Sequence, residues 1–254
     1  MAVWYTCIVS YDGTDYFGWQ WQPNKPTVVG MLQNRFHSLF KQSIKITGAS
    51  RTDASVHAYG QVAVFSTDLN IDPLKLMRVW NRALPGDIVI RELILLPQKI
   101  NPLCGVEEKV YQYHFSTIQP MPFWQRYCYF INRDIDIEKC RAALQIFVGT
   151  HDFRSFCTGY EMNSTIRTIK SIDIEFVEEY QCYRIIFKGS GFLRYMIRRI
   201  VGASLEASFR DNITIEYLQK VLAMRNARQT LLTAPGHGLC LYKITYKKIE
   251  KDKE

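Results

Sequence analysis

The densest group of side chains able to do chemistry lies in ASRTDASVHAY, residues 49–59. Arg51 and Asp53 stand two positions apart in this segment, between a predicted helix and a predicted strand. A carboxylate held beside a basic side chain stays ionised and can act as a nucleophile or a general base. In the simpler interpretation, Thr52 and Asp53 only cap backbone groups of a turn. The residues alone leave both interpretations open.

Two hydrolytic alternatives fit the same segment poorly. Asp53, Ser55 and His57 lie within five positions, too close for the two histidine nitrogens to face different partners in a triad, and the chain has no G-x-S-x-G. A glycosidase would need a second carboxylate near Asp53, and no acidic residue stands beside it in the segment.

A second group of candidates lies in GFLRYMIRRIVGASLEA, residues 191–207. The apolar residues recur at helical spacing, which predicts one helix over the whole segment. Arg194 and Arg198, four apart, would then share a face. Arg198 lies beside the apolar stripe, and a buried arginine needs an anionic partner, for which Asp53, a phosphate or a glutamate would serve equally. Arg194 and Arg199 fit an exposed basic face.

The third candidate is Tyr111, in the strand-like segment EEKVYQYHF, residues 107–115. Period-two alternation places Tyr111 and Tyr113 on one face of that strand. Tyr111 could line a cleft, or it could simply pack within a sheet.

These candidates are carried by an alternating series of predicted strands and helices. The periodicity predicts strands at 3–10, 57–67, 88–96, 110–118, 166–180, 182–190 and 240–248, and helices at 27–42, 73–84, 136–148, 191–207 and 214–225. The series of strands and helices starts again near residue 106, so we expect an α+β chain of two similar halves, 1–105 and 106–254. Each half would be an open sheet with helices on one face, and the two would share a cleft.

Composition narrows the class of protein. The 254 residues include 32 Lys+Arg and 24 Asp+Glu, a net charge of +8 that points weakly to a polyanionic partner. No apolar run reaches the roughly 18 residues that span a bilayer. Seven scattered cysteines without C-x-x-C indicate a reducing compartment, and the histidines and cysteines lack the spacing of a metal site.

Taken together, the motifs resemble the TruA family of tRNA pseudouridine synthases, in order and over nearly the whole chain. The most specific motif is SRTDASVHA (50–58), which resembles the family's signature GRTD-x-GVHA. The others are YDGTDYFGWQWQ (11–22), TVVGMLQ (27–33), LPGDI (84–88), KVYQY (109–113), FVGTHDFRSF (147–156), TIRTI (165–169), GFLRYMIRRIVG (191–202) and APGHGLCL (234–241).

The resemblance assigns roles by position. Asp53 matches the catalytic aspartate, which attacks or deprotonates the ribose while the base is detached, turned and rejoined through C5. Arg198 matches the arginine that pairs with that aspartate. Tyr111 matches the tyrosine that packs against the target base and is the candidate for proton removal at C5. Arg51, Tyr111 and Arg194 are the expected substrate-binding residues.

The resemblance also implies a pseudouridine synthase fold of two ferredoxin-like or RRM-like halves with antiparallel mixed sheets flanking a central cleft. It implies a cytoplasmic homodimer that modifies uridines in the anticodon stem-loop of tRNA. The target base must leave its stack to react. Because substrate and product are isomers, neither a cofactor nor a metal is expected.

The chain departs from the family pattern at two places. Ser50 and Ser55 stand where the signature has glycine, and Asn101 and Leu103 stand where histidine and arginine are expected. A serine at a position of positive φ costs on the order of 1 kcal/mol, and a missing arginine removes a contact to RNA. These departures keep one alternative open, a tRNA-binding or chaperone paralogue of the same fold with weakened catalysis.

Overall fold

The computed structural model describes residues 2–158 and 164–247, which fall into two compact units. The first unit runs to Lys109 and includes the residues from Leu241 onward, and the second runs from Val110 to Cys240. The boundary between the two units therefore lies inside the strand β5 (Val106–Ser116), a few residues after the expected boundary at 105/106. The C-terminal residues, expected in the second half, group with the first unit because the last strand, β10 (Leu239–Tyr246), lies beside β3 (His57–Thr67).

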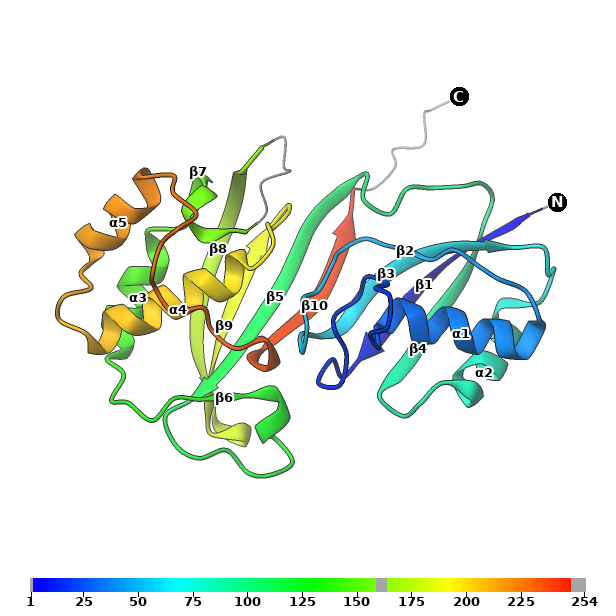
Figure 1. The fold of residues 1–254 in the computed structure, drawn as a ribbon, viewed down its shortest axis with the longest axis horizontal. Helices are drawn as coiled ribbons and strands as arrows, with labels where there is room; N and C mark the ends of the chain where they lie inside the picture. Colours follow the sequence, from blue (N-terminus) through cyan, green and yellow to red (C-terminus); the bar gives the residue numbers. More distant parts are fainter. Residues whose placement is uncertain (1, 159–163, 248–254) are drawn as a thin grey trace. The chain divides into compact units, whose positions relative to one another are not determined.

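The first unit has the element order of a ferredoxin-like fold (Figure 1). Strand β1 pairs antiparallel with both β3 and β4, and β2 pairs antiparallel with β3, which gives the order β4-β1-β3 with β2 on the other side of β3. The strands predicted at 3–10, 57–67 and 88–96 are confirmed to within one residue. The last strand, predicted at 240–248, runs from Leu239 to Tyr246, and the short strand β2 was not predicted. The elements are β1 (Val3–Tyr11), α1 (Val28–Phe40), β2 (Thr47–Gly48), β3 (His57–Thr67), α2 (Pro73–Ala83), β4 (Ile88–Leu96) and β10 (Leu239–Tyr246).

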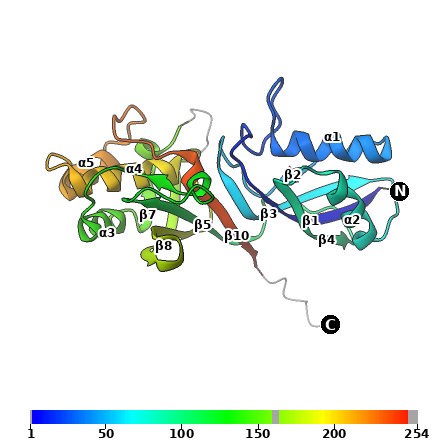
Figure 2. The same ribbon diagram turned by 90° about the horizontal axis from the view of Figure 1, so that it is seen from below.

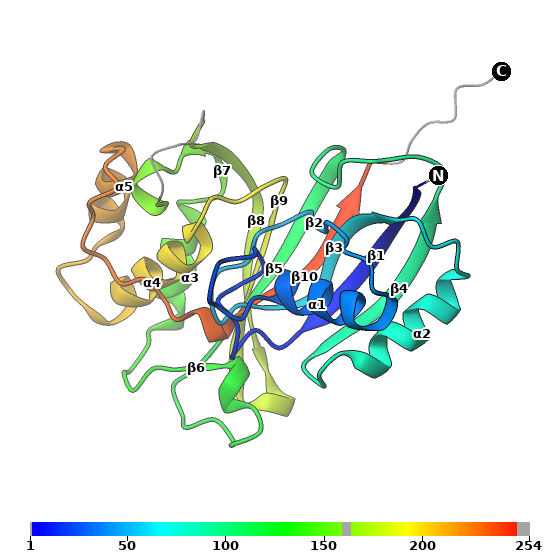
Figure 3. The same cartoon turned by 45° about the vertical axis from the view of Figure 1, so that its right-hand side comes forward.

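Local signals in the sequence fix both helices of this unit. The side chain of Thr27 accepts a hydrogen bond from the backbone of Gly30 and begins α1, and Asp72 does the same for Lys75 at the start of α2. Lys41 ends α1 with a φ of 56°. Both helices cover one face of the sheet (Figure 3), where the rings of Phe36, Phe65 and Trp80 meet edge to face.

Alternation along β1 separates the two faces of this sheet. Tyr5, Cys7 and Val9 are buried on the face that carries the helices, with α1 along that side in Figure 2. Thr6 and Ile8 alternate with them and point to the opposite face.

The second unit has the succession β-β-α-β-β-β-α-α, which differs from that of the first unit. Its strands lie in the order β5-β9-β8-β7, with β6 beside β5 and antiparallel pairing of β8 with β9 and β7. The elements are β5 (Val106–Ser116), β6 (Tyr129–Phe130), α3 (Ile137–Gln145), β7 (Gly149–Asp152), β8 (Ile166–Val177), β9 (Cys182–Gly189), α4 (Met196–Phe209) and α5 (Ile215–Ala223). Short 3-10 helices lie at Gln125–Tyr127, Arg154–Phe156, Glu178–Tyr180 and Gly236–Gly238. The predicted α+β class and the predicted hairpin at 166–190 are confirmed.

One helix begins later than predicted. The sequence predicts a helix from residue 191, but α4 begins at Met196, because Tyr195 has a φ of 62° and ends any helical path through it. Arg194 therefore lies outside the helix, and the prediction that Arg194 and Arg198 share a helical face is wrong. Within the described residues, no helix is long and apolar enough to cross a membrane.

Candidate active site

The loop after β1 packs directly on the segment that carries Asp53. Gly13 lies so close to this segment that a Cβ atom would stand 2.1 Å from the carbonyl oxygen of Val56. Gly18 has a φ of 90°, and a Cβ there would stand 2.4 Å from the carbonyl oxygen of Thr52. Both positions therefore require glycine, and the YDGTDYFGWQ motif serves to hold the Asp53 segment.

Hydrogen bonds fix the residues on both sides of Asp53. The backbone N–H of Trp19 donates to the carbonyl of Thr52 at 3.2 Å, and that of Ser55 donates to the carbonyl of Tyr16 at 3.1 Å. The hydroxyls of Tyr11 and Thr52 are 2.7 Å apart and hydrogen-bonded in the interior. The ring of Trp19, only 1% exposed, stacks on Tyr11. The sequence reasoning missed Trp19 and Tyr11 as positioning residues, although both belong to the motif at 11–22.

Asp53 itself stands at the first position of a tight turn. The backbone N–H of Val56 donates to the Asp53 carbonyl at 3.2 Å, and Ser55 has a φ of 61°. In type II turns the third residue has a positive φ and is usually glycine. The expected strain is thus present at Ser55, whereas Ser50 has no positive φ.

His57 has a structural role beside this turn. Its Nδ1 lies 3.0 Å from the backbone nitrogen of Gly13 and 3.1 Å from a carboxylate oxygen of Asp12. Burial alone would raise the pKa of Asp12, but hydrogen bonds from His57 and Thr14 outweigh it and hold that pKa well below its usual range. An ionised Asp12 therefore anchors the start of the loop.

The second unit positions Tyr111 on β5. Tyr111 is buried, and its ring meets that of Phe192 edge to face at 5.3 Å. Tyr113, two residues on, is also buried and donates its hydroxyl to the carbonyl of Pro235 at 3.0 Å. Burial raises the pKa of Tyr113 well above its ordinary value. The shared orientation predicted for these two tyrosines agrees with their burial.

Arg198 lies in the first turn of α4 and is held at two points. Its Nε donates to the carbonyl of Ala234 at 2.8 Å, and its guanidinium lies 4.9 Å from the centre of the Tyr195 ring. The guanidinium of Arg194 lies 5.1 Å from the centre of the same ring. Tyr195, which the sequence did not single out, thus organises the two arginines in place of the predicted helical face.

The position of Arg199 also differs from the prediction. The sequence placed it on an exposed basic face, but it is half-buried, and its Nη1 donates to the carbonyls of Ser155, Cys157 and Ala227 at 2.8–3.3 Å. Burial lowers its pKa. Arg199 joins α4 to two other segments of the second unit, a role that periodicity along one helix cannot reveal.

The predicted site residues divide between the two units. Arg51, which is exposed, and Asp53 belong to the first, and Tyr111, Arg194 and Arg198 belong to the second. The pairing of Asp53 with Arg198 stays a prediction. No group of three or more His, Cys, Asp or Glu side chains suited to a metal ion occurs in residues 2–158 and 164–247.

Comparison with known proteins decides the family. The model of a family described as tRNA pseudouridine synthase matches residues 7–97 and 143–247. The chain belongs to the tRNA pseudouridine synthase family. The ranges matched include Asp53 and Arg198, whereas Tyr111 lies between them.

Curated relatives cover nearly the whole chain. A protein named tRNA pseudouridine synthase A from Chlamydia abortus is 37% identical over 95% of this chain and 91% of its own length. Proteins of the same name from Thermosipho melanesiensis and Anoxybacillus flavithermus are 37% and 35% identical, over 93% and 94% of this chain and 97% of their own lengths. The resemblance seen in the motifs is thereby confirmed.

Proposed function

We propose that this member of the tRNA pseudouridine synthase family isomerises uridine to pseudouridine in the anticodon stem-loop of tRNAs, acting as a homodimer. The observation that carries the proposal is the rigid turn that presents Asp53, inside a segment that the family model matches. Membership of the family already implies that the chain is an isomerase that makes pseudouridine in tRNA.

Asp53 is the proposed catalytic carboxylate. It attacks or deprotonates the ribose as the bond between C1′ and N1 of uridine breaks. The detached base then turns so that C5 bonds to C1′, and the proton on C5 is lost while N1 gains one. No atom is gained or lost overall. Hydrogen bonds to Thr52 and Ser55, on the two sides of Asp53, hold its backbone before substrate arrives, which limits the entropy lost on the way to the transition state.

Arg198 and Tyr111 complete the proposed catalytic set. Arg198 pairs with Asp53 and keeps it ionised, which a delocalised guanidinium does well in a site closed to water. Tyr111 packs against the target base and takes the C5 proton. The edge-to-face contact with Phe192 supports this role for Tyr111, because it fixes the plane of the ring.

The proposed tRNA contacts outside the catalytic set rest on charge. Arg51 and Arg194 are exposed, as residues that bind phosphate or a flipped nucleotide must be before the tRNA arrives. The net charge of +8 supplies the salt-sensitive, sequence-independent part of the affinity.

The test is the substitution Asp53→Asn, which keeps the shape of the side chain and removes its charge. Tritium release from tRNA labelled at uridine C5 is expected to fall on the order of a thousandfold or more, while the dissociation constant for tRNA stays within about twofold. The matched control is Asp68→Asn, an exposed aspartate after β3, which should turn over like the wild type.

Each result has a definite meaning for the proposal. An active Asp53→Asn protein would exclude Asp53 as the catalytic carboxylate. A wild-type protein that binds tRNA but releases no tritium would favour the tRNA-binding paralogue instead. Mapping pseudouridine in tRNA from cells with and without the protein identifies the uridines, and sites outside the anticodon stem-loop would contradict that part of the proposal.

A further inference from the structure

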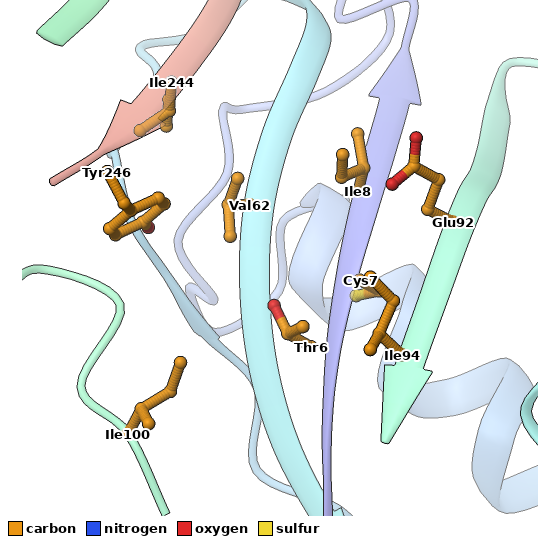
Figure 4. Close-up of a pocket in the computed structure, with 9 residues that line it drawn as sticks. All are labelled: Thr6, Cys7, Ile8, Val62, Glu92, Ile94, Ile100, Ile244 and Tyr246. Carbon is orange, nitrogen blue, oxygen red and sulfur yellow. The ribbon is translucent and has the colours of Figure 1, made fainter. Parts of the chain in front are cut away.

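The hollow on the first unit's sheet offers no built site for a small ligand. Figure 4 shows the residues around it, which come from β1, β3, β4 and β10 and from the loop after β4. Its volume is about 260 Å³, below the roughly 300–1,000 Å³ of sites that enclose small molecules. Among the described residues that line it, only Glu92 is charged. The hollow therefore lacks a group of charged side chains that would orient a ligand.

The second unit contains an irregular segment, residues 231–235, that we call the strap. It follows α5 and leads towards β10, and Figure 1 draws it in orange-red between those two elements. The strap has neither helix nor strand, yet Leu231 and Ala234 in it are buried. Backbone N–H and C=O groups of a buried segment need hydrogen-bond partners outside regular structure. The partners of the strap therefore show what holds it in place.

Three residues of α4 form the surface on which the strap lies. Arg198, Gly202 and Glu206 are spaced four apart and so fall on one face of the helix. A Cβ atom at Gly202 would stand 2.0 Å from the carbonyl oxygen of Leu232. Glycine at this position lets the strap approach the helix backbone closely.

Arg198 and Glu206 hold the strap at the two ends of this contact. The backbone N–H of Ala234 donates to the carbonyl of Arg198 at 2.9 Å, and Nε of Arg198 donates back to the carbonyl of Ala234 at 2.8 Å. About two turns farther along α4, Oε2 of Glu206 accepts a hydrogen bond from the backbone N–H of Leu232 at 2.7 Å. A shift of Leu232 would therefore move the carbonyl that fixes the guanidinium of Arg198.

The carboxylate of Glu206 holds Leu232 more firmly than a packing contact would. Glu206 is only 7% exposed, and a buried carboxylate needs hydrogen bonds and an opposite charge. Its Oε1 meets this need by pairing with Nη1 of Arg210 at 2.5 Å, which leaves Oε2 for the strap. Hydrogen bonds to an ionised group are roughly twice as strong as those between neutral groups.

We propose that Glu206 is a positioning residue for Arg198 and acts through the strap. The inference rests on the proposed function, in which the guanidinium of Arg198 pairs with the catalytic carboxylate, and it adds the residue that sets the direction of that guanidinium. Glu206 holds Leu232, the strap carries this restraint to Ala234, and the carbonyl of Ala234 fixes Nε of Arg198.

The first test observes the Nε–H group of Arg198 in proton–nitrogen correlation spectra of the full chain, where the spectrum of Arg198→Lys identifies its signal. Glu206→Met keeps the length of the side chain and removes the acceptor. It is expected to shift the signal and to speed the exchange of this N–H with water at least about tenfold, because the bond to Ala234 opens more often. Glu206→Gln keeps an acceptor for Leu232 and should preserve the signal.

Two further variants make the spectroscopic test specific. Leu232→Pro removes the N–H that Glu206 accepts and leaves the salt bridge with Arg210, so it should change the Arg198 signal as Glu206→Met does, and it replaces that variant if Glu206→Met does not fold. Arg210→Ala is the matched control, because it removes the salt bridge and leaves the bond to the strap.

The spectra also contain their own reference. Nε of Arg184 donates to Glu175 at 2.7 Å on the β8–β9 hairpin, and its signal should be the same in every variant. An unchanged Arg198 signal in the folded disrupting variants would overturn the inference. An equal change in Arg210→Ala would overturn it too, because the salt bridge rather than the strap would then be responsible.

The second test is a double-mutant cycle measured by tritium release from tRNA. Glu206→Met is expected to lower kcat at least about tenfold with KM within about twofold, and to cost less than about twofold when added to Arg198→Lys, because both substitutions disturb the same group. Arg210→Ala should keep the kcat of the wild type. A further tenfold loss in the Arg198→Lys background would show that Glu206 acts by another route and would overturn the inference.

The two tests separate this inference from the proposed function. If the wild type releases no tritium, the proposed function fails, yet a changed Arg198 signal in Glu206→Met still supports the link between the two residues and an unchanged one overturns it. If tritium release is normal and is lost in Asp53→Asn while the Arg198 signal does not respond to Glu206, the function stands and the inference falls.

Discussion

Arg198 is held by two contacts that need different properties of its side chain. Nε donates along its own N–H direction to Ala234, and the flat guanidinium lies over Tyr195. These two contacts set the direction in which the other N–H groups of the guanidinium point. A lysine has one point charge, so it could make at most one of them.

Substitution of Arg198 by lysine is therefore expected to lower kcat/KM for tRNA at least about tenfold, which is ~1.4 kcal/mol of transition-state stabilisation. Tritium release measures the loss, and tRNA affinity should change little. Arg184→Lys is the matched control, because Arg184 pairs with Glu175 on the exposed β8–β9 hairpin. Wild-type turnover of Arg198→Lys would contradict the proposed pairing with Asp53.

The turn that carries Asp53 holds a residue in a conformation that favours glycine. Ser55 has a φ of 61°, and its backbone N–H is committed to Tyr16, so the turn cannot relax without breaking that bond. The surrounding loop therefore stabilises a local conformation that a serine resists. This is the clearest physical consequence of the chain's departure from the family signature.

Ser55→Gly is expected to raise the free energy of unfolding by about 1 kcal/mol, because glycine adopts positive φ without a steric penalty. Urea denaturation measures the change as a higher midpoint with an unchanged slope. The neighbouring substitution Ala54→Gly is the control: Ala54 has no positive φ, so glycine there should destabilise. Equal effects of the two substitutions would show that Ser55 is not strained.

Across the whole molecule, the net charge of +8 does not say where RNA is bound. The loop after β4 has leucine at position 103, where the family resemblance leads one to expect arginine. Asn101 accepts a hydrogen bond from the backbone of Leu103 at 3.1 Å, and Leu103 is 58% exposed. An exposed leucine there contributes nothing to phosphate binding.

Leu103→Arg is expected to tighten tRNA binding several-fold at low salt and to steepen the dependence of log affinity on log salt by about one. Filter binding over a salt series measures both. Leu74→Arg on α2 adds the same charge at another exposed leucine and serves as the control. Equal gains from both substitutions would show that only net charge counts, and no gain from Leu103→Arg would place this loop away from the RNA.

The sequence by itself determined the longer strands, most of the helix bounds, the Asp53 segment and the family, but not the short strands β2, β6 and β7. Periodicity and caps are local, so β3 and β4 were predicted at the bounds that the structure has, and Thr27 was identified as the N-cap of α1. The motifs were equally local, since each is a short run whose residue types can be read without knowing what lies opposite.

Only the tertiary structure decided which residues position the candidates. The left-handed Tyr195 shortened α4, and Arg199 is a half-buried link that donates to three carbonyls from two other segments of the chain. The order of the strands in the first unit is also a tertiary property, because β4, β1, β3 and β10 lie side by side although they are distant in sequence. Long-range pairing places these groups together, and no pattern along a single segment contains that information.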